Sequence, residues 1–408
     1  MSRIVLGVAG GIAAYKACLL LRRFTEAGHD VTVVPTRNAL EFVGSTTWSA
    51  LSGKPVSAEV FDAAEQVRHV RLGREAELVV VAPATADLLS RAATGRADDL
   101  LTNVLLTAGC PVLLAPAMHT EMWQHPATRA NVATLRSRGV VVLDPADGRL
   151  TGADSGPGRL PEPEDIEAVA LSLLADPALA GRLAGQDLAG RRVLISAGGT
   201  REAIDPVRFV GNSSSGRMGL ALARAAAARG AEVTVVAANL GLPVPAGVRS
   251  VPVVSTGELA TELFARAAAA DLVVMAAAPA DYTPVAPSDT KLKKSGDAGL
   301  TVELRQTTDI LARLAAERPE GQVVVGFAAE TAGPADELLR LGQAKLARKG
   351  CQLLVLNDVS GGRVFGSDAT DTVIISSTGV VASAAGSKSA VAHAIIDAAL
   401  AVSERKPA

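Results

Sequence analysis

Short, uninterrupted apolar runs recur along the chain, and stretches with the helical spacing of apolar residues separate them. In the first half, these runs predict strands at residues 3–8, 31–35, 78–82, 112–115 and 140–143. The stretches between them predict helices at residues 12–26, 38–51, 86–92, 97–108 and 126–137, with a further helix after residues 161–164. Apolar runs that alternate with helices are typical of parallel strands covered on both faces of a sheet.

The second half begins the same pattern again. Its apolar runs predict strands at residues 192–197, 233–237, 272–277, 323–327, 353–356 and 372–376. Residues 180–190 are rich in Gly and Ala and have no clear period, so we expect domains at residues 1–185 and 190–408. The predicted fold class is α/β: two doubly wound, mostly parallel sheets, each with a ligand site beyond the carboxyl ends of its strands.

Composition argues against several classes of function. The formal net charge of −2 gives no reason to expect a nucleic-acid partner, and only eleven aromatic residues argue against a stacking platform for single strands. Three scattered cysteines form neither a metal spacing nor a disulfide framework, which fits a reducing cytoplasm. Residues 100–120 carry no charge, but Gly109, Pro111 and Pro116 interrupt them, so we expect a helix and a buried strand there and no membrane span.

A glycine loop follows the first predicted strand, at residues 7–16. Flexible backbone before a helix N-terminus suits a phosphate group, although a glycine turn without a ligand fits the motif equally well. The spacing differs from G-x-G-x-x-G, so a dinucleotide site is only weakly indicated. Small residues and hydroxyls follow the next three strands, at Thr36 and at residues 82–87 and 115–119, and describe a wall for a flat ligand. His69 fits either a surface residue or an acid/base near neutral pH.

These segments match a family in order and spacing. Residues 10–16, 68–70, 82–87 and 116–118 resemble the homo-oligomeric flavin-containing cysteine decarboxylases, which have a flavodoxin-like fold. The resemblance implies that FMN oxidises a C-terminal-type cysteine so that carbon dioxide leaves, and that His69 is the acid/base. It also implies a homo-oligomer, with the flavin site between subunits of a trimer and further association to dodecamers. The residues implied to hold FMN are Gly10, Gly11, Ile12, Ala13, Thr36, Pro83, Thr85, Ala86 and Met118.

Two positions depart from that family's pattern. His119 stands where many relatives have an Asn that holds the substrate carboxylate, and an imidazole can also donate a hydrogen bond to a carboxylate. The flap before residues 156–159 lacks the cysteine that relatives use as a proton donor. Thr151 is a poor acid, and Asp154 could serve if burial raised its pKa, so the proton donor stays unassigned.

The second half carries a phosphate-binding pattern of its own. Gly199 and Thr200 follow the strand at residues 192–197, and an Asn-Ser-Ser-Ser-Gly-Arg run at residues 212–217 precedes an alanine-rich helix. The serines suit a helix cap alone, or a cap that also binds phosphate oxygens, and the density of the run favours phosphate binding.

Lysines lie at two further places in this half. The basic cluster at residues 291–294 falls in a long irregular region, residues 278–299, and suits either a solvated loop or a polyphosphate contact. Lys345 and Lys349 share one helix face, which suits either solubility or a cationic lid.

This half resembles the phosphopantothenate–cysteine ligases, whose fold is Rossmann-like, at residues 198–202, 205–208, 212–216, 280–282, 291–294, 326–331 and 357–359. The resemblance implies that the carboxylate of 4′-phosphopantothenate attacks the α-phosphate of CTP, that pyrophosphate leaves, and that the amine of L-cysteine attacks the acyl-cytidylate. Asn212 would contact the acyl intermediate, Mg²⁺ would bridge phosphate oxygens, and this half would dimerise. The residues implied to surround CTP are Gly199, Thr200, Ser213, Ser214, Asp281, Lys291, Thr307, Thr308, Asp309, Ile310, Phe327, Lys345 and Lys349. Residues 307–310 read Thr-Thr-Asp-Ile where the family has Asn-Pro-Asp-Ile.

Together the two resemblances cover residues 3 to about 376 and point to the bifunctional bacterial family that performs two successive steps of coenzyme A synthesis. The competing class is a two-domain oxidoreductase in which both glycine loops hold one NAD(P). A scaffold without chemistry is a more distant alternative.

Overall fold

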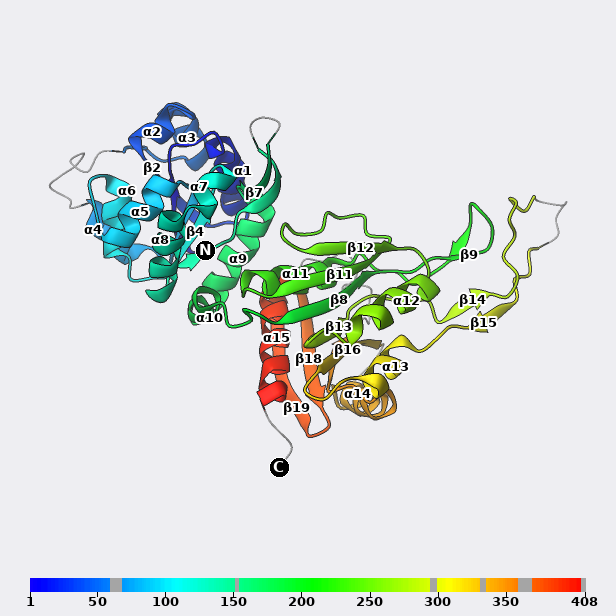
Figure 1. The fold of residues 1–408 in the computed structure, drawn as a ribbon. Helices are drawn as coiled ribbons and strands as arrows, with labels where there is room; N and C mark the ends of the chain where they lie inside the picture. Colours follow the sequence, from blue (N-terminus) through cyan, green and yellow to red (C-terminus); the bar gives the residue numbers. More distant parts are fainter. Residues whose placement is uncertain (59–67, 151–153, 294–298, 331–334, 359–368, 405–408) are drawn as a thin grey trace. The chain divides into compact units, whose positions relative to one another are not determined.

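The computed structural model describes residues 1–408 apart from 59–67, 151–153, 294–298, 331–334, 359–368 and 405–408. The chain divides into two compact units, Met1–Asp187 and Leu188–Ala408, and each is described by itself (Figure 1). In the described ranges, every helix falls short of the length or the apolar character that a membrane span requires.

The first unit is built on a five-stranded parallel sheet. Its order is β2-β1-β3-β4-β5, formed by β2 (Asp30–Pro35), β1 (Arg3–Val8), β3 (Leu78–Ala84), β4 (Val112–Pro116) and β5 (Val141–Val142). β3 is buried over its whole length, and β1 is buried beyond its first residue. The predicted doubly wound sheet is confirmed, and the strand order is the flavodoxin-like one, in which ligands bind beyond the carboxyl ends at the switch point between β1 and β3.

Helices pack on this sheet, and a two-stranded hairpin formed by β6 (Ala146–Arg149) and β7 (Ser155–Arg159) precedes the ninth of them. The helices are α1 (Ala14–Glu26), α2 (Arg37–Leu40), α3 (Ser45–Ser52), α4 (Arg68–Glu75), α5 (Ala86–Thr94), α6 (Leu100–Thr107), α7 (Thr120–Gln124), α8 (Pro126–Ser137), α9 (Pro163–Ala175) and α10 (Leu179–Gly185).

One local prediction in this unit is wrong. The helix expected at residues 38–51 is interrupted, because Gly44 takes an extended conformation and N-caps α3 separately from α2. Glycine is a weak helix former, so a break there costs little. Residues 180–190, which showed no clear period in the sequence, contain most of α10, because its Ala and Gly residues provide little of the polar–apolar contrast that marks a helix.

The second unit is built on an eight-stranded sheet of order β12-β11-β8-β13-β16-β17-β18-β19. The first six strands in this order run parallel and reproduce the Rossmann order, whereas β18 and β19 add an antiparallel edge. Their bounds are β12 (Arg249–Val253), β11 (Glu232–Ala238), β8 (Arg192–Gly198), β13 (Leu272–Met275), β16 (Val323–Glu330), β17 (Leu353–Asp358), β18 (Ala369–Ser376) and β19 (Gly379–Ser387).

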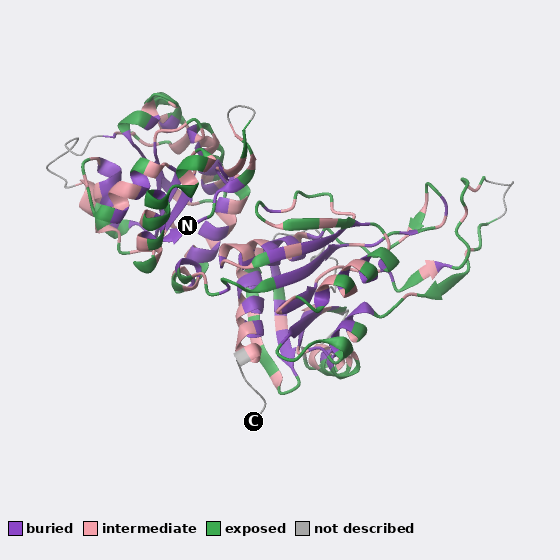
Figure 2. Cartoon of the chain, viewed as in Figure 1, coloured by how far each residue is buried: buried purple, intermediate pink, exposed green. Residues whose placement is uncertain are grey.

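Two buried layers, one on each face of this sheet, form the core of the second unit. On one face, residues such as Val193 and Ile195 pack with α11 (Arg217–Ala228) and α15 (Lys388–Glu404). On the other face, Leu194 and its neighbours pack with α12 (Thr256–Ala267), α13 (Ile310–Glu317) and α14 (Ala335–Lys349). Figure 2 shows these strands buried between the helices.

Two small hairpins extend the second unit. β9 (Glu202–Ala203) pairs with β10 (Phe209–Val210), and β14 (Tyr282–Pro284) pairs with β15 (Leu304–Gln306). In Figure 1 both hairpins project beyond the body of the sheet. The region 278–299, expected to be irregular, therefore contains the strand β14.

Candidate active sites

A cavity of about 700 Å³ opens at the carboxyl edge of the second sheet. Its walls come from the loop before α11, the segment after β13, the start of α13, and side chains of α14, β16, β17, β18 and α15. Most of the residues predicted to act in this half line the cavity together: Asn212, Ser213, Ser214, Asp281, Thr307, Thr308, Asp309, Ile310, Phe327, Lys345 and Lys349.

Asn212 lies at the mouth of this cavity and is held by the opposite loop. Its Nδ2 donates to the carbonyl oxygen of Pro279 at 2.8 Å and lies 3.4 Å from Oδ2 of Asp281. Because the amide nitrogen is occupied, the side-chain orientation is fixed. The loop before α11 and the segment after β13 are thereby joined at the cavity.

Asp309 and Lys349 join α13 to α14 at another wall. The Asp309 carboxylate accepts from the backbone N–H of Ala312 at 3.1 Å and from Nζ of Lys349 at 2.5 Å. Burial acts to raise the pKa of Asp309, but the hydrogen bonds from Lys349 and Ala312 outweigh it, so this pKa lies below its usual value. Asp309 therefore caps α13 as an anion and orients a lysine at the cavity edge.

Gly199 and Thr200 lie behind the cavity wall and are not among its lining residues. A Cβ on Gly199 would stand 2.6 Å from the carbonyl oxygen of Asn212, so glycine is needed for the close approach of two loops. Thr200 is 1% exposed, and its hydroxyl accepts from the N–H of Ala280 at 2.8 Å. Both residues support the residues that line the cavity.

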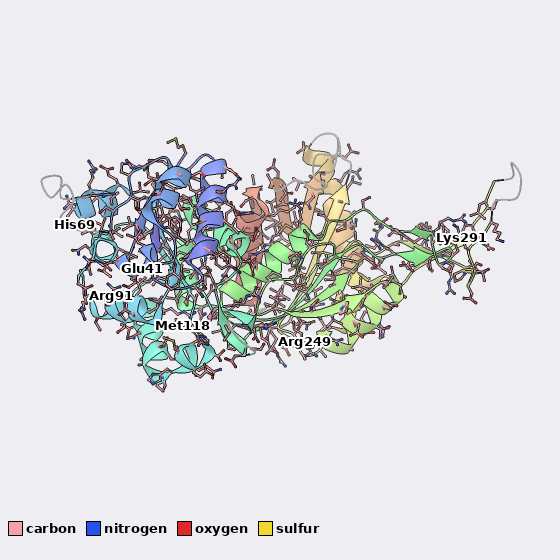
Figure 3. All side chains as sticks on the ribbon, turned by 90° about the horizontal axis from the view of Figure 1, so that it is seen from above. Glu41, His69, Arg91, Met118, Arg249 and Lys291 are labelled. Carbon is pink, nitrogen blue, oxygen red and sulfur yellow. The ribbon has the colours of Figure 1, made fainter. Side chains whose placement is uncertain are left out.

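Lys291 is also absent from the lining residues and lies on the projecting segment between β14 and β15 (Figure 3). Asp205, whose side chain is fully buried, secures the base of this segment. Its carboxylate accepts from the N–H groups of Val207 and Arg208, each at 2.8 Å, and from that of Leu292 at 3.2 Å. Lys294, from the same predicted cluster, lies outside the described residues.

In the first unit, the predicted cofactor residues gather at the carboxyl edge beside β1 and β3. A Cβ on Gly10 would stand 2.4 Å from Cβ of Asn38, and one on Gly11 would stand 3.7 Å from Thr85. The glycine loop therefore packs closely on the starts of α2 and α5.

The remaining predicted residues at this edge come from the helix starts and the loop between them. Thr36 and Thr85 N-cap α2 and α5, and their hydroxyls accept backbone N–H groups at 3.3 Å. Ala13 N-caps α1, Pro83 is the penultimate residue of β3 and Ala86 opens α5, whereas Ile12 is 64% exposed.

Met118 and His119 follow β4 at the same edge. The N–H of Met118 donates to the carbonyl oxygen of Gly158 at 2.9 Å, which joins this loop to the hairpin strand β7. His119 N-caps α7 without a side-chain capping bond, and its side chain is exposed and available to a ligand.

His69 lies on α4, where the hydroxyl of Thr107 on α6 donates to its carbonyl oxygen at 3.0 Å. Its Nδ1 is buried and has no hydrogen-bond partner among the described residues. In Figure 3 His69 and Met118 lie at separate places on the unit. A buried nitrogen without a partner is costly, and a ligand or another subunit would satisfy it.

Asp154 does not meet the condition for the hypothetical proton donor. It is exposed just before β7, so the burial that this role required is absent. The other candidate, Thr151, lies outside the described residues. No group of three or more His, Cys, Asp or Glu side chains in the described ranges is arranged to hold a metal ion.

Sequence reasoning missed several residues that line the cavity of the second unit. Asn357 was quoted only as part of a motif, without a role, and Thr370 and Lys388 were not singled out. Lys388 follows β19, a strand of small residues that the apolar pattern did not reveal. The location of Lys388 directly after this strand is the sequence feature that could have indicated a role at the cavity.

Both halves of the chain match families of known proteins. Residues 1–174 match the family described as Flavoprotein, and residues 188–402 match the DNA/pantothenate metabolism flavoprotein C-terminal domain. The chain is 55% identical over 404 residues to the coenzyme A biosynthesis bifunctional protein CoaBC of Mycobacterium bovis, covering 97% of this chain and 96% of that protein. It is 41% identical over 398 residues to the protein of the same name from Vibrio cholerae, with the same coverage. A solved C-terminal domain of a CoaBC protein aligns with 52% of this chain and 95% of its own, at 32% identity and a TM-score of 0.43.

Proposed function

Since this chain belongs to the family of bifunctional coenzyme A biosynthesis proteins, which join a flavoprotein decarboxylase to a ligase, we propose how its residues divide the two reactions. Residues 190–408 ligate 4′-phosphopantothenate with L-cysteine at the expense of CTP. Residues 1–185 decarboxylate the phosphopantothenoylcysteine so formed to 4′-phosphopantetheine. Both domains work on small molecules in the cytoplasm.

The ligase assignment rests on one observation: residues from distant parts of the second half line the same cavity. The substrate carboxylate attacks the α-phosphorus of CTP and expels pyrophosphate, and the cysteine amine then attacks the acyl carbon and expels CMP. Lys345 and Lys349 offset the negative charge of the phosphates, and a bound Mg²⁺ would supply further charge neutralisation there. Asn212, fixed by Pro279, positions the acyl group for both attacks.

The carboxyl edge of the first sheet suits FMN. The glycine loop and the starts of α2 and α5 bring backbone N–H groups and the hydroxyls of Thr36 and Thr85 to this edge, where a phosphate can bind, and Ile12 offers an exposed apolar side chain to a flat ring. When bound, the flavin supplies the oxidation that makes loss of carbon dioxide possible. His119 orients the substrate carboxylate by a hydrogen bond, and His69 moves the proton.

Exposed apolar side chains support assembly with further copies of this chain. On α1, Tyr15 and Leu19 are 58% and 52% exposed and continue from Ile12 along one helix face. This face lies beside the proposed flavin site, in keeping with a trimer-based homo-oligomer that encloses the cofactor. On the hairpins of the second unit, Val207 and Phe209 are 60% and 52% exposed, which suits the dimerisation of the ligase half.

The test is an incubation of the purified holoprotein with phosphopantothenate, cysteine, CTP and Mg²⁺, with pyrophosphate and carbon dioxide followed separately. We expect a yellow protein that releases both products. Asn212→Ala should stop pyrophosphate release, whereas His69→Asn should stop only the loss of carbon dioxide from supplied phosphopantothenoylcysteine. Tight NAD(P) binding without pyrophosphate release would instead support the oxidoreductase alternative.

A further inference from the structure

A series of buried hydrogen bonds lies behind the cavity wall of the second unit. Its members are Glu202, Thr256 and Thr200, each at most 5% exposed and none among the lining residues, and we call them the Glu202 relay. Oε1 of Glu202 accepts from both the N–H and the hydroxyl of Thr256, at 2.8 and 2.9 Å. The hydroxyl oxygens of Thr256 and Thr200 lie 2.8 Å apart. A carboxylate is rarely buried so completely, so its position calls for an explanation.

Hydroxyl chemistry gives the relay one direction. A threonine hydroxyl has one hydrogen to donate and two lone pairs that accept. The hydrogen of Thr256 points to Glu202, since its other acceptor, the carbonyl oxygen of Ala280, lies farther away at 3.4 Å. The hydroxyl of Thr200 then donates to Thr256, and its oxygen accepts from the N–H of Ala280 at 2.8 Å. Glu202 therefore sets the direction of every hydrogen bond in the relay.

The relay ends on the segment that holds Asn212. Ala280 supplies the last N–H donor, and its carbonyl oxygen accepts from the hydroxyl of Thr307 at 2.7 Å. The residues on either side of Ala280, Pro279 and Asp281, are the two contacts of the Asn212 side-chain nitrogen. A shift of Ala280 would therefore move both partners of Asn212.

A purely structural role for Glu202 is the alternative. Thr256 is the first residue of α12, so its N–H is one of those that a helix leaves without an internal partner. Glu202 satisfies this N–H and places a negative charge at the helix N-terminus. The two roles differ in what they control, because a helix cap affects stability whereas the relay affects the rate of ligation.

We propose that Glu202 is a positioning residue of the ligase, which acts through Thr256 and Thr200 to fix Asn212 for the reaction. This inference rests on the proposed role of Asn212 in ligation and deepens it. The three relay residues lie behind the wall and do not bind substrate. Their loss should therefore lower kcat and leave the KM for CTP nearly unchanged.

The test compares Thr256→Val with Thr256→Ser in the full-length holoprotein, well below the melting temperature of each variant. Valine keeps the shape but interrupts the relay, whereas serine restores the hydroxyl. Pyrophosphate release should slow about tenfold in Thr256→Val, the kinetic equivalent of one lost hydrogen bond, and return close to wild type in Thr256→Ser. Glu202→Met should slow it as Thr256→Val does, and Glu202→Gln should retain most turnover, because an amide oxygen also accepts hydrogen bonds.

Ser255→Ala is the matched control at the same helix start. Ser255 N-caps α12, and its Oγ accepts from the N–H of Glu258 at 3.2 Å, outside the relay. Its loss should lower the melting temperature and leave ligase kcat unchanged. The proposal is overturned if Ser255→Ala and Thr256→Val lower kcat alike, or if Thr256→Val turns over at the wild-type rate.

Amide hydrogen exchange separates this proposal from the proposed function. If wild type releases no pyrophosphate, the ligase assignment fails, and the relay is then judged by exchange in the peptide that contains Ala280. Faster exchange there in Thr256→Val and Glu202→Met than in Ser255→Ala supports the relay, because only the first two variants release the Ala280 segment. Equal exchange in all three variants refutes it.

Discussion

Gly199→Ala should disable the ligase without affecting the decarboxylase. The added Cβ would stand 2.6 Å from the carbonyl oxygen of Asn212, whereas ordinary contact begins at about 3.4 Å, so the Asn212 loop must retreat by about 0.8 Å. A retreat along the bond to Pro279 would stretch that hydrogen bond from 2.8 Å to about 3.6 Å, beyond a normal hydrogen-bond length.

A displacement of this size at a reacting group lowers the turnover rate far more than it lowers the free energy of unfolding. We expect ligase kcat to fall on the order of a hundredfold, with a stability loss of about 1–3 kcal/mol from overpacking. The assay is pyrophosphate release from CTP and phosphopantothenate. Carbon dioxide release from supplied phosphopantothenoylcysteine provides an internal control in the same preparation.

Gly257→Ala is the matched glycine control in the same unit. A Cβ there would meet only Oγ of Ser255, at 3.8 Å, so α12 should accept it without loss of activity. The reasoning is refuted if Gly199→Ala retains wild-type ligase turnover, or if Gly257→Ala loses as much as Gly199→Ala does.

Three further outcomes follow from contacts in the second unit. Lys349→Met should raise the KM for CTP and lower stability by about 0.5–1 kcal/mol at neutral pH. Because the pKa of Asp309 is lowered in the folded state, that difference should persist above the unfolded pKa and vanish as pH falls through the folded one, as thermal melts at pH 7 and pH 3 would show. Burial raises the pKa of Cys351 to about 11, so iodoacetamide at pH 8 should label it only after denaturation, as mass spectrometry of its peptide would show. Asp397→Ala should destabilise the second unit by about 2 kcal/mol, measured by urea unfolding, because fully buried Arg229 loses a carboxylate at 2.7 Å.

The central strands of both sheets were predictable because they are buried on both faces and read as continuous apolar runs. The edges were not. β12 begins with the exposed residues Arg249 and Ser250, and β19 consists mostly of small residues, each half-buried or exposed. An edge strand of this kind has too little apolar contrast to be recognised from its sequence.

The carboxyl-edge rule located the cavity but not the role of each residue in it. Asn212 and Asp281 face the cavity as expected. Gly199 also follows a strand, yet its missing side chain makes room for another loop. Spacing along the chain cannot distinguish backbone that approaches a ligand from backbone that approaches backbone. Asn357 escaped notice because its distinguishing property, a buried oxygen without a hydrogen-bond partner among the described residues, exists only in three dimensions.

The core of the second unit is completed by its last helix, α15, so this unit can finish folding only late in synthesis. Val391, Ile395 and Ile396 complete the buried layer that α11 begins, although α11 leaves the ribosome long before them. The first unit is a compact unit that ends at Asp187, so it can fold while the second is still being translated. The ligase cavity, with Lys388 in its wall, cannot close until the end of α15 has emerged. During that interval the alanine-rich face of α11 that packs against α15 stays uncovered, so a stalled or truncated chain would expose it to aggregation and to proteases.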